Sequence, residues 1–236
     1  ESRALSEAFA ESLGLNAGQV LAVNGSDEAL NFAFMAFGES LAFPDISYGF
    51  YPVIAELNHI PYTEIPLHED MSLDPEDYFD LGRMVVIANP NAPTGLLLPV
   101  SEIERILASN PGHVVVIDEA YVDFGAASCL RLIDAYDNLL VVQTFSKSRS
   151  LAGARLGFAM GSEALISDLN RIKYSTNPYS VNSMTMAAGI AALSEQAYYD
   201  QRCCEIIATR EKTLAELKRL GFEVTESLGN FVFGGN

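Results

Sequence analysis

One lysine lies in a setting that could give its amine a chemical role. Lys147 comes soon after an apolar run, residues 139–142, that is typical of a buried strand. The hydroxyl groups of Thr144 and Ser146 precede it and Arg155 follows eight positions later, so these groups could hold a phosphate while the amine reaches a bound aldehyde. Schiff-base formation needs a neutral amine, which burial beside cationic groups favours. Taken alone, Lys147 is equally compatible with an ordinary loop lysine.

A second apolar run, residues 114–117, ends in a carboxylate. Asp118 follows this run directly, and a charge at the end of a buried strand requires a partner. One such partner is the ring nitrogen of a pyridine cofactor, which an acid keeps protonated so that the ring can accept electrons. Tyr121 lies just beyond. The alternative is that Asp118 caps a following helix.

Two loops rich in turn-forming residues also follow apolar runs. The loop at 89–95 has the sequence Asn-Pro-Asn-Ala-Pro-Thr-Gly and follows the run 84–88. Loops at the carboxyl ends of strands bind ligands in open α/β sheets. The turn Gly25-Ser26-Asp27 separates a strand-like run from an apolar helical pattern, where backbone N–H groups could hold phosphate. Many ordinary helices begin with the same residue types.

Strand-like and helix-like patterns alternate along most of the chain, which is typical of a mostly parallel sheet covered on both faces. We therefore expect a three-layer α/β/α domain, and 236 residues with 49% hydrophobic content can bury such a core. The last part, residues 183–220, is helical in pattern, with 195–220 as one long helix before strands at 222–224 and 231–233. The other expected strands are 20–23, 41–43, 84–88, 114–117, 139–143 and 156–160, and the other expected helices include 28–37, 100–108 and 164–172.

Together these segments resemble, in order and spacing, the fold type I pyridoxal-phosphate aminotransferases of class I/II, and most closely the histidinol-phosphate aminotransferase group. The resemblance extends over nearly the whole chain. It implies pyridoxal 5′-phosphate as the cofactor and three catalytic residues: Lys147 bonded to the cofactor, Asp118 on its ring nitrogen and Tyr121 on its phenolic oxygen. Tyr48 would stack on the ring. The implied phosphate-binding residues are Gly25, Ser26, Asp27, Thr144, Ser146 and Arg155.

The chain departs from the family pattern at one position of the 89–95 loop. The family commonly has an asparagine directly before Pro-Thr-Gly that contacts the ring oxygen, and here that position is Ala92. We expect Asn91, or else Asn89, to make the contact instead. A turn-forming role for these asparagines is the alternative.

The resemblance implies transfer of an amino group from a donor, L-histidinol phosphate first, to 2-oxoglutarate in histidine biosynthesis. Threonine-phosphate decarboxylases and aromatic aminotransferases share the same framework, and a non-catalytic cofactor-binding domain or an inactive fragment would also keep it. In domain terms we expect residues 1–194 to form the cofactor-binding large domain. Residues 195–236 would hold the long helix and the start of a small α+β domain. The family also implies a homodimer.

Charge and cysteine content limit the remaining classes of partner. The chain has 14 Lys and Arg against 31 Asp and Glu, a formal net charge of −17, which disfavours nucleic acid and anionic membranes. No apolar run is long enough to span a bilayer. The three cysteines and the scattered His59, His68 and His113 lack metal-ligand spacing, so we expect no metal site. Unpaired cysteines favour a reducing cytoplasm.

Overall fold

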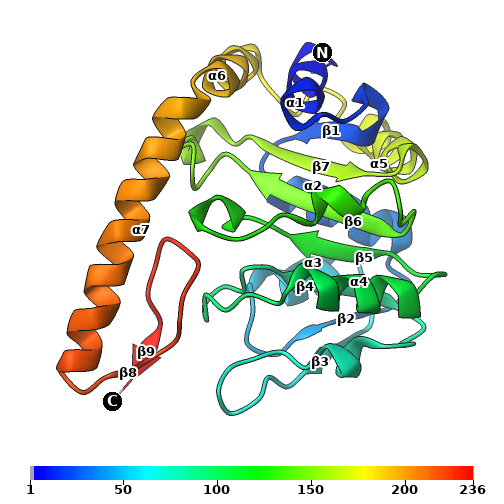
Figure 1. Cartoon of the computed structure of the whole chain (residues 1–236). Helices are drawn as coiled ribbons and strands as arrows, with labels where there is room; N and C mark the ends of the chain where they lie inside the picture. Colours follow the sequence, from blue (N-terminus) through cyan, green and yellow to red (C-terminus); the bar gives the residue numbers. More distant parts are fainter. Residues whose placement is uncertain (1–2, 236) are drawn as a thin grey trace.

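A seven-stranded sheet forms the centre of the molecule in the computed structural model, which describes residues 3–235 (Figure 1). Across the sheet the strands lie in the order β1-β7-β6-β5-β4-β2-β3. Among the strands of the described residues in this sheet, β7 runs antiparallel to both of its neighbours, β1 and β6, and all the other pairings are parallel. The fold is therefore the mostly parallel α/β arrangement that the sequence predicts. The strands are β1 (Val20–Val23), β2 (Leu41–Pro44), β3 (Tyr62–Ile65), β4 (Met84–Ala88), β5 (Val115–Asp118), β6 (Leu139–Thr144) and β7 (Gly157–Gly161).

Six of these strands are buried, apart from the half-buried Gln143 of β6, because helices cover both faces of the sheet, and their apolar runs made them predictable. The edge strand β3 has the sequence Tyr-Thr-Glu-Ile and stays partly exposed, so it carries no such run and sequence analysis missed it. The register places Ala88 of β4 beside Asp118 of β5, and Thr144 of β6 beside Gly157 of β7. The ends of these central strands therefore meet at one edge of the sheet.

Two clusters of buried apolar side chains separate the helices into two layers. One cluster joins the sheet to α1, α4 and α6, and the other joins it to α2, α3 and α5. The predicted three-layer architecture is thus confirmed, although the short helix α3 was not anticipated. The helices of the two layers are α1 (Arg3–Leu13), α2 (Ser26–Phe37), α3 (Phe50–Leu57), α4 (Val100–Ser109), α5 (Glu163–Thr176) and α6 (Ser183–Ser194).

The last part of the chain leaves these layers as a long helix, α7 (Gln196–Arg219), which runs along one side of the sheet (orange in Figure 1). It is separate from α6, with Glu195 between them, and it agrees with the expected long helix at 195–220 to within one residue at each end. The chain ends in a small hairpin in which β8 (Glu223–Val224) pairs with β9 (Gly234–Gly235). The prediction of a strand at 231–233 is wrong. The Phe231 ring packs against Tyr121, and the residues that pair with β8 are Gly234 and Gly235, which come after this segment.

The expected domain ranges include residues 1, 2 and 236, which lie outside the described residues. The proposed boundary after residue 194 falls at the break between α6 and α7. Within residues 3–235, no helix has both the length and the apolar character needed to cross a membrane.

Candidate active site

A cavity of about 170 Å³ lies at the carboxyl ends of the central strands. Parallel strands end at the same edge of a sheet, so the loops that follow β4, β5 and β6 converge there. Nine of the eleven site residues expected from the sequence line this cavity. The fold thus brings together side chains that lie more than 100 positions apart in the chain. They are Ser26, Asp27, Tyr48, Asp118, Tyr121, Thr144, Ser146, Lys147 and Arg155.

The connection from β6 to β7 carries Lys147 and returns tightly on itself. The amide of Phe145 donates to the carbonyl of Leu156 at 2.9 Å, which extends the pairing of the two antiparallel strands into the loop. Arg155 therefore lies just before the return strand β7, close to the residues that end β6. The hydroxyl of Thr144 lies 2.9 Å from that of Ser146, and the Nζ of Lys147 lies 5.0 Å from the centre of the Tyr121 ring. The half-buried amine thus shares the cavity with a phenol and two hydroxyls.

Asp118 is a buried carboxylate, with only 4% of its surface exposed. Its Oδ2 accepts a hydrogen bond from the Tyr51 hydroxyl at 3.0 Å, and its Oδ1 accepts one from the amide of Ala120 at 3.1 Å. Burial raises the pKa of Asp118 to about 6, although these two hydrogen bonds oppose the shift. Tyr51 is fully buried, and sequence analysis gave it no role. Its contact with Asp118 depends on the position of α3 relative to the end of β5, and the sequence did not predict this helix.

Asp27 joins two other site residues at the mouth of the cavity. Its Oδ2 lies 3.0 Å from Nη2 of Arg155, and its Oδ1 accepts from the Tyr48 hydroxyl at 3.0 Å. Burial, and then the neighbouring Asp27 carboxylate, raise the pKa of Tyr48. These contacts hold the guanidinium and the aromatic ring in place on opposite oxygens of one carboxylate.

The turn before α2 approaches the guanidinium of Arg155 closely. Gly25 has a φ of +77°, and a Cβ at this position would lie 2.4 Å from Nη2 of Arg155. The backbone angle therefore requires glycine, and a side chain here would also displace the guanidinium. Gly25 itself does not line the cavity, but it lets the N-terminus of α2 face the space that Arg155 also faces.

A network that sequence analysis missed fixes this turn from behind. The Oε2 of Glu28 accepts from the amide of Asn24 at 2.6 Å and from the hydroxyl of Ser180 at 2.7 Å. Asn24 Nδ2 also donates to the carbonyl of Ser180 at 2.6 Å. The loop at 177–182, which links α5 to α6, is thereby joined to the turn that carries Gly25.

The two asparagines expected to reach the cavity do not line it. The Oδ1 of Asn91 accepts from the Ser47 hydroxyl at 2.8 Å, and its Nδ2 donates to the carbonyl of Ile46 at 2.9 Å. Asn89 exchanges hydrogen bonds with the backbone N–H and C=O of Leu98. Both side chains shape the loop, and Pro90 and Ala92 are the residues of this segment that line the cavity.

Two other features lie apart from this cavity. A groove of about 800 Å³ runs between α7 and residues 149–151 and 230–232, and it contains none of the expected site residues. At the surface, His68, Asp74 and Asp77 bring one potential ligand atom each within 4.8 Å of the others. Asp74 uses its Oδ1 to accept from the amide of Glu76, which begins a short 3-10 turn. The cluster is therefore the capped start of a 3-10 turn, with His68 and Asp77 beside Asp74, rather than an enclosed metal site.

Comparison with known proteins places these features in a family. The family model for aminotransferase class I and II matches residues 2–234. Histidinol-phosphate aminotransferase 1 of Bordetella parapertussis is 52% identical over 96% of this chain, and histidinol-phosphate aminotransferase of Lactococcus lactis subsp. cremoris is 49% identical over 99%. The chain spans 65% and 66% of the lengths of these two relatives.

Solved structures show the same fold. The histidinol-phosphate aminotransferase of Clostridium acetobutylicum superposes with a TM-score of 0.91 at 24% identity, covering 99% of this chain and 72% of that one. The histidinol-phosphate aminotransferase of Sinorhizobium meliloti, solved in complex with pyridoxal-5′-phosphate, gives a TM-score of 0.88 at 22% identity, covering 98% of this chain and 65% of that one. At these identities the likeness bears on the fold alone.

Proposed function

The chain belongs to the aminotransferase class I and II family, and we propose that it forms the cofactor-binding part of a pyridoxal-phosphate-dependent aminotransferase. One observation carries this proposal: the half-buried amine of Lys147 shares a single cavity with the buried carboxylate of Asp118 and with the guanidinium of Arg155. An amine, an acid and an anion-binding group are the three functions that an aldehyde cofactor with a pyridine ring and a phosphate requires.

The residues present suit this cofactor. Each oxygen of Asp118 accepts one hydrogen bond from the protein, so the carboxylate keeps acceptor capacity for a ring N–H. The close approach of Gly25 to Arg155 gives a phosphate both backbone N–H groups and a guanidinium. The positive end of the α2 dipole lies at the same turn. In this proposal Ser26, Asp27, Thr144 and Ser146 complete the phosphate site around Gly25 and Arg155.

Bound pyridoxal phosphate supplies an aldehyde and an electron-withdrawing ring. Asp118 would hold a proton at the ring nitrogen of this group, and a positive ring would in turn favour the ionised carboxylate. Tyr121 would donate to its phenolic oxygen, and Tyr48 would pack on the ring. The amine of Lys147, once free, would take a proton from the α-carbon of the substrate and return it at C4′.

For the amino donor we propose L-histidinol phosphate, with 2-oxoglutarate as the acceptor. The support is the name shared by the relatives from Bordetella and Lactococcus, at 52% and 49% identity over almost all of this chain. Threonine phosphate and aromatic amino acids are the competing donors.

Borohydride reduction in the presence of pyridoxal phosphate tests the proposal directly. We expect a visible absorbance band before reduction and, by mass spectrometry, a phosphopyridoxyl group on Lys147 afterwards. The exposed Lys212 provides the control, since Lys212→Arg should leave the labelling unchanged and Lys147→Ala should abolish it. Labelling that persists in Lys147→Ala, or an absent band in the wild-type chain, would contradict the assignment.

The same band reports the donor without requiring complete turnover. Adding histidinol phosphate in slight excess should remove the visible band in a single half-reaction, and threonine phosphate or tyrosine should remove it more slowly. A faster response to either competitor would replace the proposed donor by that compound.

We further infer that the protein forms a homodimer in a reducing cytoplasm. The free thiols Cys129, Cys203 and Cys204 are consistent with that compartment. Tyr179 and Met184 expose 74% and 83% of their surfaces near the start of α6, and burying them in an interface would remove this apolar surface from water. Light scattering should give the mass of a dimer for the wild-type chain and of a monomer for Met184→Glu. An unchanged mass in this variant would place the interface elsewhere.

A further inference from the structure

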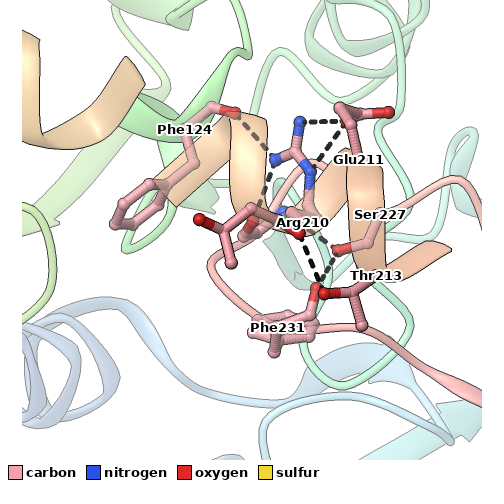
Figure 2. Close-up of polar contacts among 8 residues, drawn as sticks. Phe124, Arg210, Glu211, Thr213, Ser227 and Phe231 are labelled. Atoms are coloured by element: carbon pink, nitrogen blue, oxygen red, sulfur yellow. Dashed lines mark hydrogen bonds and ion pairs between the residues drawn. The ribbon is translucent and has the colours of Figure 1, made fainter. Parts of the chain in front are cut away.

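Arg210 is a buried arginine outside the cavity, and its hydrogen bonds join segments distant in the chain. It lies on α7 with 6% of its surface exposed. Its Nη1 donates to the carbonyls of Phe124 and Gly229, both at 2.9 Å. Its Nε and Nη2 donate to Oε1 of Glu211 at 3.1 and 2.9 Å. Figure 2 shows the guanidinium held between the Phe124 carbonyl and Glu211.

The first of these carbonyls belongs to the loop that carries Tyr121. A 3-10 turn, Val122–Phe124, follows Tyr121 directly, and the amide of Phe124 donates to the carbonyl of Tyr121 at 3.1 Å. Gly125 then ends the turn with a φ of +119°. Arg210 therefore holds the far end of a short rigid turn whose near end is a proposed catalytic residue.

The second carbonyl belongs to a segment that packs against the ring of Tyr121. The hydroxyl of Ser227 donates to the carbonyl of Phe231 at 2.8 Å and accepts from the amide of Gly229 at 3.1 Å, which closes residues 227–231 into a compact loop. The Phe231 ring meets the Tyr121 ring edge to face at 5.0 Å and 88°. The same phenol ring lies beneath the amine of Lys147 at 5.0 Å.

We propose that Arg210 is a positioning residue for Tyr121. By joining the carbonyl of Phe124 to that of Gly229, it fixes both the backbone after Tyr121 and the ring of Phe231 that packs on it, and so sets the direction of the phenol. A lysine cannot reproduce this bridge, because arginine has a planar fork of donors that serves two carbonyls and a carboxylate at once. The role in catalysis rests on the proposed function, but the positioning itself does not.

Fluorine NMR tests the positioning without any cofactor. The chain is labelled with 3-fluorotyrosine, and the Tyr121 signal is identified by its loss in Tyr121→Phe. We expect this signal to shift in Arg210→Lys. It should also shift in Phe231→Leu, which removes the ring that packs on Tyr121 and leaves Arg210 intact. Arg202→Lys, on the same helix and partly exposed, is the matched control and should leave the signal in place. Circular dichroism verifies that each variant is folded.

A double-mutant cycle then tests whether the positioning reaches the cofactor. With pyridoxal phosphate bound, Tyr121→Phe removes a donor to the ring oxygen and should move the pH midpoint of the visible band by about half to one unit. Arg210→Lys should move it in the same direction. If Arg210 acts through Tyr121, the double variant moves the midpoint no further than Tyr121→Phe alone.

The outcomes are separable. An unchanged Tyr121 signal in Arg210→Lys, or additive shifts in the cycle, would overturn the positioning role. A wild-type chain that gives no visible band would contradict the proposed function, and the fluorine signal would still decide the role of Arg210.

Discussion

Asp118 is the site residue whose charge the fold accommodates least easily. It is buried, and its two hydrogen bonds, from the Tyr51 hydroxyl and the Ala120 amide, only partly compensate for the loss of water. Its pKa of about 6 in the folded chain exceeds the ordinary value of 3.8. A carboxyl group with a raised pKa contributes full stability below pH 4, and that contribution declines as the pH rises through 6. The cofactor-free protein should therefore lose stability over this range.

Asp118→Asn should remove this loss. The shift in pKa corresponds to about 3 kcal/mol, or roughly 5 to 10 °C in Tm for a chain of this length. We expect the cofactor-free wild type and Asp118→Asn to have similar Tm values at pH 4, and the variant to be the more stable at pH 8. Thermal unfolding at the two pH values measures the difference, because the other titrating groups are common to both proteins. A constant difference across this range would mean that Asp118 does not titrate there.

Tyr51 and Tyr78 form a natural pair for measuring what the hydrogen bond to Asp118 contributes. Both are buried, but the Tyr51 hydroxyl donates to Asp118, whereas the Tyr78 hydroxyl has no hydrogen-bond partner among residues 3–235. Tyr51→Phe at pH 8 should lower the free energy of unfolding by about 1 to 3 kcal/mol, since it leaves a buried carboxylate oxygen unpaired. Tyr78→Phe should be neutral or stabilising. Urea unfolding measures both, and equal effects would show that the hydrogen bond makes no net contribution.

At the scale of elements, the turn into α2 combines an unusual backbone angle with a close contact. Gly25→Ala adds strain at a φ of +77° and forces a methyl group against Arg155. Gly14→Ala is the matched control, because Gly14 has a φ of +70° and open space around its Cα. Gly14→Ala should cost about 1 kcal/mol of stability through the backbone, and Gly25→Ala roughly 1 to 3 kcal/mol, because its ψ of 160° places it in a region that is essentially confined to glycine.

Only Gly25→Ala should weaken pyridoxal phosphate, by about tenfold or more, because it displaces a guanidinium that binds the phosphate through charge-assisted hydrogen bonds. Titration of the visible band gives both dissociation constants. If the two variants bind the cofactor equally well, the contact with Arg155 has no part in phosphate binding, and only the backbone strain remains.

The elements that sequence analysis identified are those whose own residues carry the signal. Strand β4 is a continuous apolar run because both its faces are buried, and Lys147, Asp118 and the Gly25 turn follow such runs. Helix α3 has eight residues and begins without a side-chain cap, so no local signal announced it, and the contact of Tyr51 with Asp118 stayed hidden. The bond from Ser180 to Glu28 spans 152 positions and depends on how α5 and α6 pack. Such pairings follow from tertiary structure, which no local pattern encodes.

At the scale of the whole molecule, the apolar cores and the cavity depend on different parts of the chain. Every buried member of the two core clusters lies at or before Ala192, so the sheet and its two helical layers do not need α7. The cavity loops do contact it. Arg149, two positions after Lys147, donates to Gln196 at 2.7 Å and stacks on Tyr199 at 5.0 Å, while Arg210 holds Phe124. We therefore propose residues 1–194 as a folding unit whose site is shaped by residues 195–236.

Truncation separates the two contributions. A chain of residues 1–194 should keep its far-UV circular dichroism and a cooperative unfolding transition, because its cores are complete. It should bind pyridoxal phosphate at least about tenfold more weakly. Without α7, binding must also order the loops that carry Tyr121 and Lys147, and the entropy lost in ordering them weakens the affinity. Amide exchange at 121–126 should rise in parallel. A chain ending at Gly221 keeps Arg149 and Arg210 paired to Gln196 and Phe124 but loses the hairpin, so it should bind with intermediate affinity. An unfolded 1–194 chain would refute the proposed boundary, and an undiminished affinity would show that the site needs nothing from α7.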